Sequence, residues 1–114
     1  MESQSTRQLK VSRQLQRDLS EIFREKGTQA FKGAMITVTT VRISPDLSVA
    51  RVYISIFPSA KTAEVLEIIE ALARSIRGEL GNRVSKQLRI VPELVFILDD
   101  SQDYVEKIDQ LLKK

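Results

Sequence analysis

The sequence of 114 residues contains no cysteine and no histidine. Disulfides, zinc fingers, thiol nucleophiles and imidazole bases are therefore excluded, and most transition-metal sites lose their usual ligands. A chain of this length buries roughly two-thirds of its unfolded surface, so it folds without a metal or a disulfide. We expect one domain spanning residues 1–114, without a cofactor.

Long hydrophobic runs are also missing. The longest apolar run, from Leu94 to Leu98, is much shorter than the roughly 20 residues that a membrane span needs. The N-terminus is polar and charged, which predicts no signal peptide. We expect a soluble, cytoplasmic protein without membrane contact, and the absence of cysteine is compatible with a reducing compartment.

Positive charge is concentrated in two stretches, although the net charge is only +3. Residues 1–26 carry +2, residues 27–73 carry no net charge, residues 74–89 carry +4 and residues 90–114 carry −3. This distribution favours a polyanion partner bound in a defined orientation. The alternative is a charged surface that only keeps the protein hydrated.

Residues 5–26 are predicted to form a helix that ends at Gly27, because Val11, Leu15, Leu19 and Ile22 recur at helical spacing. Four basic residues fall on the opposite side, flanked by Glu21 and Glu25. They are Lys10, Arg13, Arg17 and Arg24.

Two strands are predicted next, at residues 35–44 and 48–57, and the Ser44-Pro45-Asp46 turn joins them into a hairpin. The β-branched apolar residues of the first strand occupy even-numbered positions up to Val38 and odd-numbered positions from Val41 onward. A β-bulge near residues 39–40 or burial of the strand on both faces would explain the change.

Residues 63–92 organise the chain. Apolar residues recur every three or four positions from Val65 to Val84, which predicts a long or kinked helical segment with Thr62 as its N-cap. Residues 74–89 of this segment contain five basic residues and one acidic residue, Glu79. The basic residues are Arg74, Arg77, Arg83, Lys86 and Arg89.

A third strand is predicted after Pro92 and a short helix after Ser101. The order is helix, strand, strand, helix, helix, strand, helix. We therefore predict an α+β domain with a three-stranded sheet covered by helices on one face.

Two patterns could suggest chemistry. Gly78 and Gly81 match the GxxG that clamps phosphate in KH domains, but Glu79 would repel phosphate, so a soft, closely packed part of a helix is the favoured interpretation. The acidic residues from Asp99 to Asp109 lack EF-hand spacing, and helix capping followed by a solvated helix face explains them. We predict no metal site and no enzymatic activity.

Aromatic side chains are few, and the four phenylalanines fit core positions or a connector. Tyr53 is the one candidate for an exposed ring, which argues against an RRM-type aromatic platform. Recognition of RNA through phosphate and shape is favoured instead. The predicted phosphate contacts are Lys10, Arg13 and Arg17 from the first helix, and Arg74, Arg77, Arg83, Lys86 and Arg89 from the middle segment.

Three stretches of the sequence are distinctive. They are TVTTVRISPDLSVARVYIS at residues 37–55, SIRGELGNRVSKQLRIVPEL at residues 75–94 and FILDDS at residues 96–101. In this order they resemble the ribosome-binding factor A family. The resemblance implies a type II KH-like fold in which an Ala-x-Gly kink between the two middle helices replaces the GxxG loop. Here the kink is expected near residues 71–75. The pattern aligns with Leu72-Ala73-Arg74 or, shifted by one residue, with Ala71-Leu72-Ala73, and neither of these contains the glycine.

The resemblance also implies a function. It implies a monomeric factor without a small-molecule substrate that binds the free 30S subunit and 16S rRNA, assists late 30S maturation and rRNA processing, and is linked to growth in the cold. The residues alone support only contact with RNA phosphate. A KH-like module for another RNA and a basic protein–protein adaptor remain as alternatives.

Overall fold

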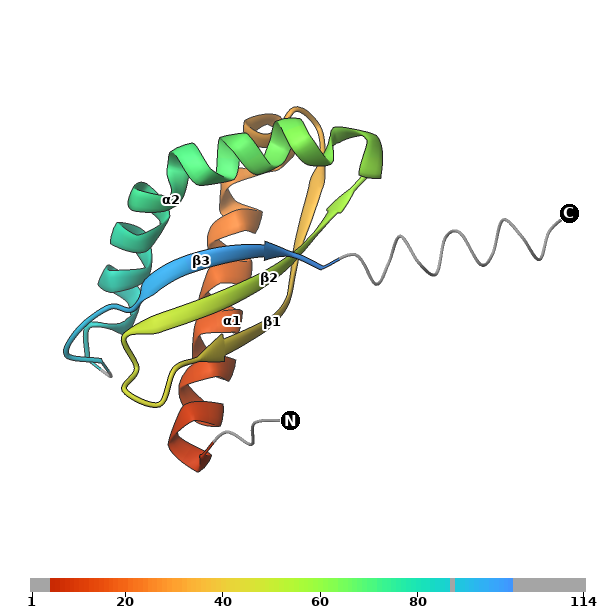
Figure 1. Cartoon of the computed structure of the whole chain (residues 1–114). Coiled ribbons are helices and arrows are strands. Elements are labelled where there is room, and N and C mark those ends of the chain that lie inside the picture. The colour runs from red at the N-terminus through yellow and green to blue at the C-terminus, as the bar shows by residue number, and fades with distance from the viewer. Residues whose placement is uncertain (1–4, 87, 100–114) are drawn as a thin grey trace, which may run out of the picture.

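The computed structural model describes residues 5–86 and 88–99. The predicted final helix, and all of the acidic cluster except Asp99, lie outside these residues. The described elements are α1 (Thr6–Lys26), η1 (Thr28–Phe31), β1 (Met35–Ile43), β2 (Val49–Phe57), η2 (Ser59–Lys61), α2 (Thr62–Val84) and β3 (Glu93–Leu98) (Figure 1).

Helix α1 forms where the sequence predicts it, and both of its ends are capped. Ser5 and Gln8 form a capping box, in which the Ser5 hydroxyl accepts from the Gln8 N–H and the Gln8 side chain accepts from the Ser5 N–H. Gly27 ends the helix at φ 74°, a backbone conformation that glycine adopts without strain. The apolar face of α1, including Leu15, Leu19 and Ile22, is buried.

The connector after α1 contributes to the core. It forms the short helix η1, which buries Phe31 so that only 1% of the residue is exposed. The Phe31 ring lies 5.7 Å from that of Phe23, and Phe23 in turn meets Phe96 of β3 edge-on at 6.2 Å. These three rings join the first helix, the connector and the last strand.

The sheet has the order β1-β2-β3, with β1 and β2 antiparallel and β2 and β3 parallel. The predicted β-bulge is confirmed, because Val38 pairs with Ile54 and Thr40 with Tyr53, which leaves Thr39 outside the register of paired residues. The bulge brings Ile36, Val38, Val41 and Ile43 to the same face.

Glutamines of α1 satisfy backbone carbonyl groups of β1. Gln16 Nε2 donates to the carbonyl oxygens of Val38 and Thr39 at 3.3 and 3.1 Å, and Gln8 Nε2 donates to that of Ile43 at 3.1 Å. These bonds fix α1 along β1, which determines the direction in which the outer face of the helix points.

The turn between β1 and β2 is built around Asp46. Its Oδ1 accepts from the Ser44 hydroxyl at 2.7 Å, from the Ser48 hydroxyl at 2.7 Å and from the Ser48 N–H at 3.1 Å. The bond from Ser44, followed by those from Ser48, stabilises the charged form and lowers the pKa of Asp46 to about 2.

We expect an NMR titration of the Asp46 carboxyl group to give a pKa of about 2. Since the folded pKa lies below the ordinary aspartate value of 3.8, the turn stabilises the fold above that pH and loses the effect as the pH falls toward 2. Ser44→Ala should raise the pKa toward 3.8, because Ser44 is the largest cause of the shift. A wild-type pKa near 3.8 would contradict this account of the turn.

Helix α2 is continuous over 23 residues and bends in its middle (Figure 1). One bent helix therefore takes the place of the two separate helices expected, and the predicted kink forms without the glycine of the family pattern. Thr62 was predicted as the N-cap, but it is the first helical residue and Lys61 occupies the cap position. The prediction failed because the preceding η2 already turns the chain into the helix.

The GxxG of Gly78 and Gly81 lies inside α2, where the helix uses the backbone N–H groups that a phosphate clamp would need. The clamp is thereby excluded. A Cβ on Gly81 would lie 3.0 Å from Val91 Cγ2, whereas one on Gly78 would meet nothing within 4 Å. Of these two glycines, only Gly81 lies so close to a neighbouring side chain that an added Cβ would crowd it.

This difference predicts unequal effects of two alanine substitutions on stability. Gly78→Ala should raise the free energy of unfolding by up to about 1 kcal/mol, because alanine favours the helix and the site is open. Gly81→Ala should raise the free energy of unfolding less than Gly78→Ala does, or should lower it, since the side chain of Val91 must shift. Urea denaturation of both variants would measure the difference, and an equal gain at both positions would contradict the packing.

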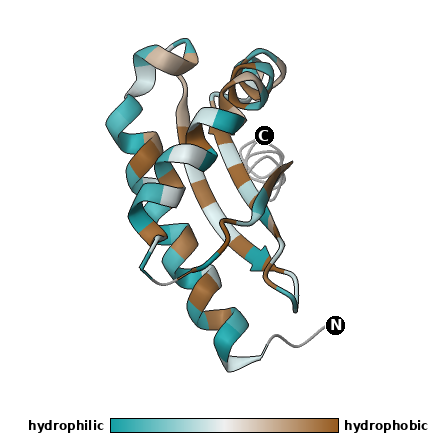
Figure 2. Cartoon of the chain, turned by 90° about the vertical axis from the view of Figure 1, so that its left-hand side faces the viewer, coloured by the Kyte–Doolittle hydropathy of each residue, from teal (hydrophilic) through white to brown (hydrophobic). Residues whose placement is uncertain are grey.

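Both helices cover one face of the sheet, as the α+β class and KH-like layout predicted (Figure 1). Hydrophobic residues recur along the helices and alternate along the strands (Figure 2). The face of α2 that contains Val65, Ile69, Ile76, Leu80 and Val84 is fully buried. Neither helix in the described part of the chain is long and apolar enough to cross a membrane.

Candidate nucleic-acid interface

Lys10, Arg13 and Arg17 are all exposed on the outer face of α1, as predicted. The surface of the helix is hollowed where Arg13, Arg17 and Arg24 lie together with Gln16, Ser20 and Glu21. Within residues 5–86 and 88–99, none of the three predicted cations makes a hydrogen bond or an ion pair. Exposed guanidinium groups without protein partners are suited to binding phosphate.

Arg83 was predicted to contact phosphate, but the structure gives it two protein partners. Its guanidinium donates from Nη1 to Glu21 Oε2 at 2.8 Å and from Nη2 to Glu25 Oε2 at 2.7 Å. The hydrogen bond to Glu25 raises the pKa of Arg83 above its usual value. Lys26 adds a third ion pair from α1 to α2, with Glu79 at 3.1 Å. The charge of Arg83 is therefore balanced by the two carboxylates of α1.

Arg77 also has a structural role. Its Nη2 donates to the carbonyl oxygen of Val91 at 2.8 Å and its Nε to that of Pro92 at 3.1 Å. These bonds tie α2 to the chain that enters β3. The carbonyl groups are neutral, so the positive charge remains, but the orientation of the guanidinium group is fixed by the protein.

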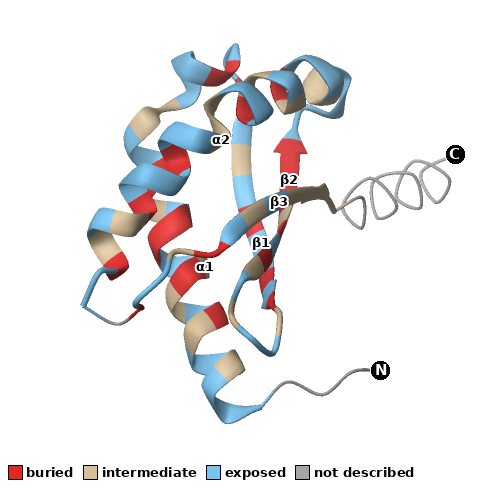
Figure 3. Ribbon diagram, turned by 60° about the vertical axis from the view of Figure 1, so that its left-hand side comes forward, coloured by how far each residue is buried: buried red, intermediate tan, exposed pale blue. Residues whose placement is uncertain are grey.

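The other three predicted residues are exposed. Arg74 lies on α2 about three helical turns before the end of the helix, whereas Lys86 and Arg89 follow that end. The structure therefore separates Arg74 from the pair. The outer sides of both helices are largely exposed, as Figure 3 shows.

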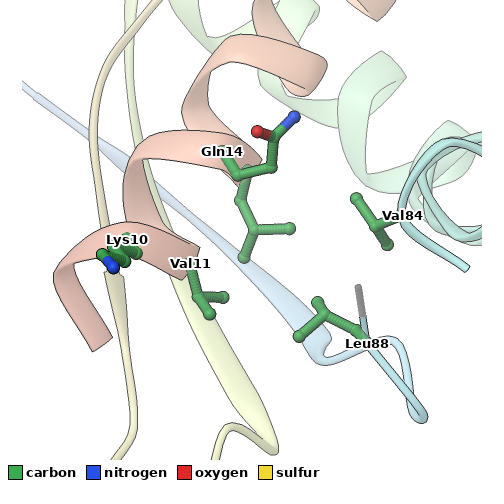
Figure 4. Close-up of a pocket in the computed structure, with 6 residues that line it drawn as sticks. Lys10, Val11, Gln14, Val84 and Leu88 are labelled. Atoms are coloured by element: carbon green, nitrogen blue, oxygen red, sulfur yellow. The ribbon is translucent and has the colours of Figure 1, made fainter. Parts of the chain in front are cut away.

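A shallow apolar pocket joins α1 to the end of α2 (Figure 4). Its volume is about 200 Å³, which is below the range of usual small-molecule sites. Lys10 lines the pocket from α1. Leu88 lines it from the segment between α2 and β3, where it lies between Lys86 and Arg89 in the sequence. The complete lining is Lys10, Val11, Gln14, Leu15, Val84 and Leu88.

The pocket brings Leu88, and with it the chain segment that contains Lys86 and Arg89, close to Lys10 of α1. We group the exposed cations of α1 with those of this segment as the helix-face basic surface, defined as Lys10, Arg13, Arg17, Lys86 and Arg89. Arg24 belongs to the same side of α1, and helical spacing alone revealed it. Arg42 and Arg51 were not predicted as site residues, because only the register of the strands shows that they lie opposite each other.

Comparison with known proteins agrees with the sequence resemblance. The family model for ribosome-binding factor A matches residues 7–112. The chain is 40% identical to ribosome-binding factor A of Cytophaga hutchinsonii over 111 residues, which cover 97% of this chain and 84% of the relative. It is 44% identical to that of Flavobacterium johnsoniae over 96% of this chain and 85% of the relative.

Solved structures give the same result. The crystal structure of ribosome-binding factor A from Thermus thermophilus matches with a TM-score of 0.68 and 27% identity, over 80% of this chain and 94% of that chain. A homology model of Thermus thermophilus ribosome-binding factor A, fitted into a cryo-EM map of its 30S complex, also matches. Its TM-score is 0.63 and its identity 30%, over 77% of this chain and 90% of that chain. The chain belongs to the ribosome-binding factor A family.

Proposed function

We propose that this protein binds the free 30S ribosomal subunit by contacting the phosphates of 16S rRNA. It would assist late maturation of the subunit and rRNA processing, as a monomer without catalytic activity. The observation that carries the proposal is the helix-face basic surface, whose exposed cations include three from α1 without protein partners in the described residues. The Thermus thermophilus relative fitted into a 30S complex supports the choice of partner.

The arrangement favours recognition of RNA shape over base sequence. Lys10, Arg13 and Arg17 are held on a helix that is itself bonded to β1 through Gln8 and Gln16. The positions of their backbone atoms are therefore fixed before binding, so only the side chains lose freedom on association. Contacts with phosphate orient a protein on RNA, and cations at fixed backbone positions favour a folded segment with matching phosphate positions.

Comigration with ribosomal particles tests the proposal. The purified protein is sedimented with small subunits, large subunits and joined ribosomes at low and moderate salt, with bulk tRNA as competitor. We expect selective comigration with free small subunits. Equal comigration with all three particles that disappears as salt rises, or displacement by tRNA, would instead indicate a general RNA-binding protein and would contradict the proposal.

A further inference from the structure

We call the face of the sheet that neither α1 nor α2 covers the open face. It carries two arginines in an unfavourable arrangement. The register of β1 and β2 places Arg42 directly opposite Arg51. Both residues are exposed, and within residues 5–86 and 88–99 neither makes a hydrogen bond or an ion pair. Like charges directly opposite each other destabilise an antiparallel sheet. Such departures from favourable local pairing are expected at functional sites.

The two arginines lie on the side of the sheet away from the helices. Their neighbours along the strands, Val41 and Ile43 in β1 and Ala50 and Val52 in β2, are buried under the helices. Side chains alternate between the faces of a strand, so Arg42 and Arg51 belong to the face that neither α1 nor α2 covers. The helices form a layer on one side of the sheet (Figure 3). Since the pair belongs to the other side of the sheet, it lies apart from the helix-face basic surface.

The surroundings of the pair suit RNA. Tyr53 lies two residues after Arg51 on the same face, about 7 Å along the strand, and is half-buried rather than fully exposed as predicted. Val95 of β3 pairs with Arg51 and is 40% exposed. Glu93 is on the same face but opposite Val49, and it forms no ion pair with either arginine. An aromatic ring beside paired guanidinium groups offers stacking for a base and contacts for its phosphate, whereas an acidic protein segment needs only the charges.

We propose that Arg42 and Arg51 form a second phosphate-binding site, which contacts an RNA segment different from that bound by the helix-face basic surface. The protein is then held between two segments of a folded RNA, one on the helix side and one on the open sheet. The proposal rests on the proposed function in one respect, since it takes the folded RNA to be 16S rRNA. An isolated short strand would not reach both faces at once.

The unfavourable pairing gives an unusual test. Arg42→Glu converts the like-charged pair into an opposite pair, so the melting temperature should rise by about 2–5 °C. The same variant should bind purified small subunits and protein-free 16S rRNA with an affinity reduced about tenfold or more.

A second variant, Arg42→Gln/Arg51→Gln, removes both cations without adding an acid. Its slope of log affinity against log salt should become shallower by about 1.4–1.8. Lys32→Gln, an exposed change outside both surfaces, is the control.

Three results would overturn the inference. If the open-face variants bind like the wild type while Arg13→Gln/Arg17→Gln binds weakly, the second site is wrong and the proposed function stands. If binding falls for small subunits but not for protein-free 16S rRNA, the open face contacts a ribosomal protein instead. If the wild type binds neither probe, the proposed function fails and the inference fails with it. A lower melting temperature for Arg42→Glu would contradict the argument from pairing.

Discussion

Arg13→Gln/Arg17→Gln is expected to weaken binding to free small subunits about 100-fold. A hydrogen bond to a charged group contributes about 1.5 kcal/mol or more, and the double variant removes two such partners of phosphate. A loss of about 3 kcal/mol corresponds to about 100-fold in the dissociation constant. Sedimentation or fluorescence anisotropy with purified small subunits would measure the loss.

The melting temperature of the same variant should stay within about 2 °C of the wild type. Both side chains are exposed and neither has a partner in the described residues, and glutamine has nearly the same helix propensity as arginine. Lys32→Gln provides a control for loss of charge elsewhere. Wild-type affinity in the double variant would show that the outer face of α1 does not contact the subunit.

Phe31→Ala is expected to destabilise the protein by about 3–5 kcal/mol, the usual cost of removing a large buried aromatic side chain. Phe31 is 1% exposed, and its ring contacts Phe23, which reaches Phe96. The cavity would therefore lie where the connector, α1 and β3 meet. Urea denaturation would measure the loss.

Phe57→Ala is the matched control. Phe57 was expected at a core or connector position, but it is 52% exposed at the end of β2, opposite the exposed Met35. We expect a change of about 0.5 kcal/mol or less, as for other surface substitutions. Equal losses at positions 31 and 57 would contradict the burial pattern of the structure.

The contrast between these two phenylalanines shows where sequence reasoning succeeds. Periodic segments were predicted well, because the apolar faces of α1, β1, β2 and α2 repeat over several turns or pairs. Phe31 lies in a polar connector, where no period exists to indicate its burial. The alternation of β2 places Phe57 on the face opposite Ala50, Val52, Ile54 and Ile56, which neither helix covers, and Phe57 is exposed there.

The candidate site was predicted in part for a similar reason. Helical spacing placed Lys10, Arg13 and Arg17 on one face, and this depends only on residues of the same helix. The partners of Arg83 are Glu21 and Glu25, 62 and 58 positions away in the sequence. A pattern within one segment cannot reveal such partners.

Arg77 illustrates the consequence for choosing variants. Its exposure suggests a phosphate ligand, yet removing its guanidinium group would also leave the carbonyl groups of Val91 and Pro92 without their donor. Loss of binding in an Arg77 variant would therefore mix stability with recognition. Lys86 and the cations of α1 give a cleaner test.

The salt dependence of binding tests the central claim most directly. The affinity for purified small subunits is measured from about 50 to 200 mM salt. Five phosphate contacts from the helix-face basic surface predict a slope of log affinity against log salt of about −3.5 to −4.5, and contacts from Arg42 and Arg51 would make it steeper. A slope near zero would contradict binding through rRNA phosphate.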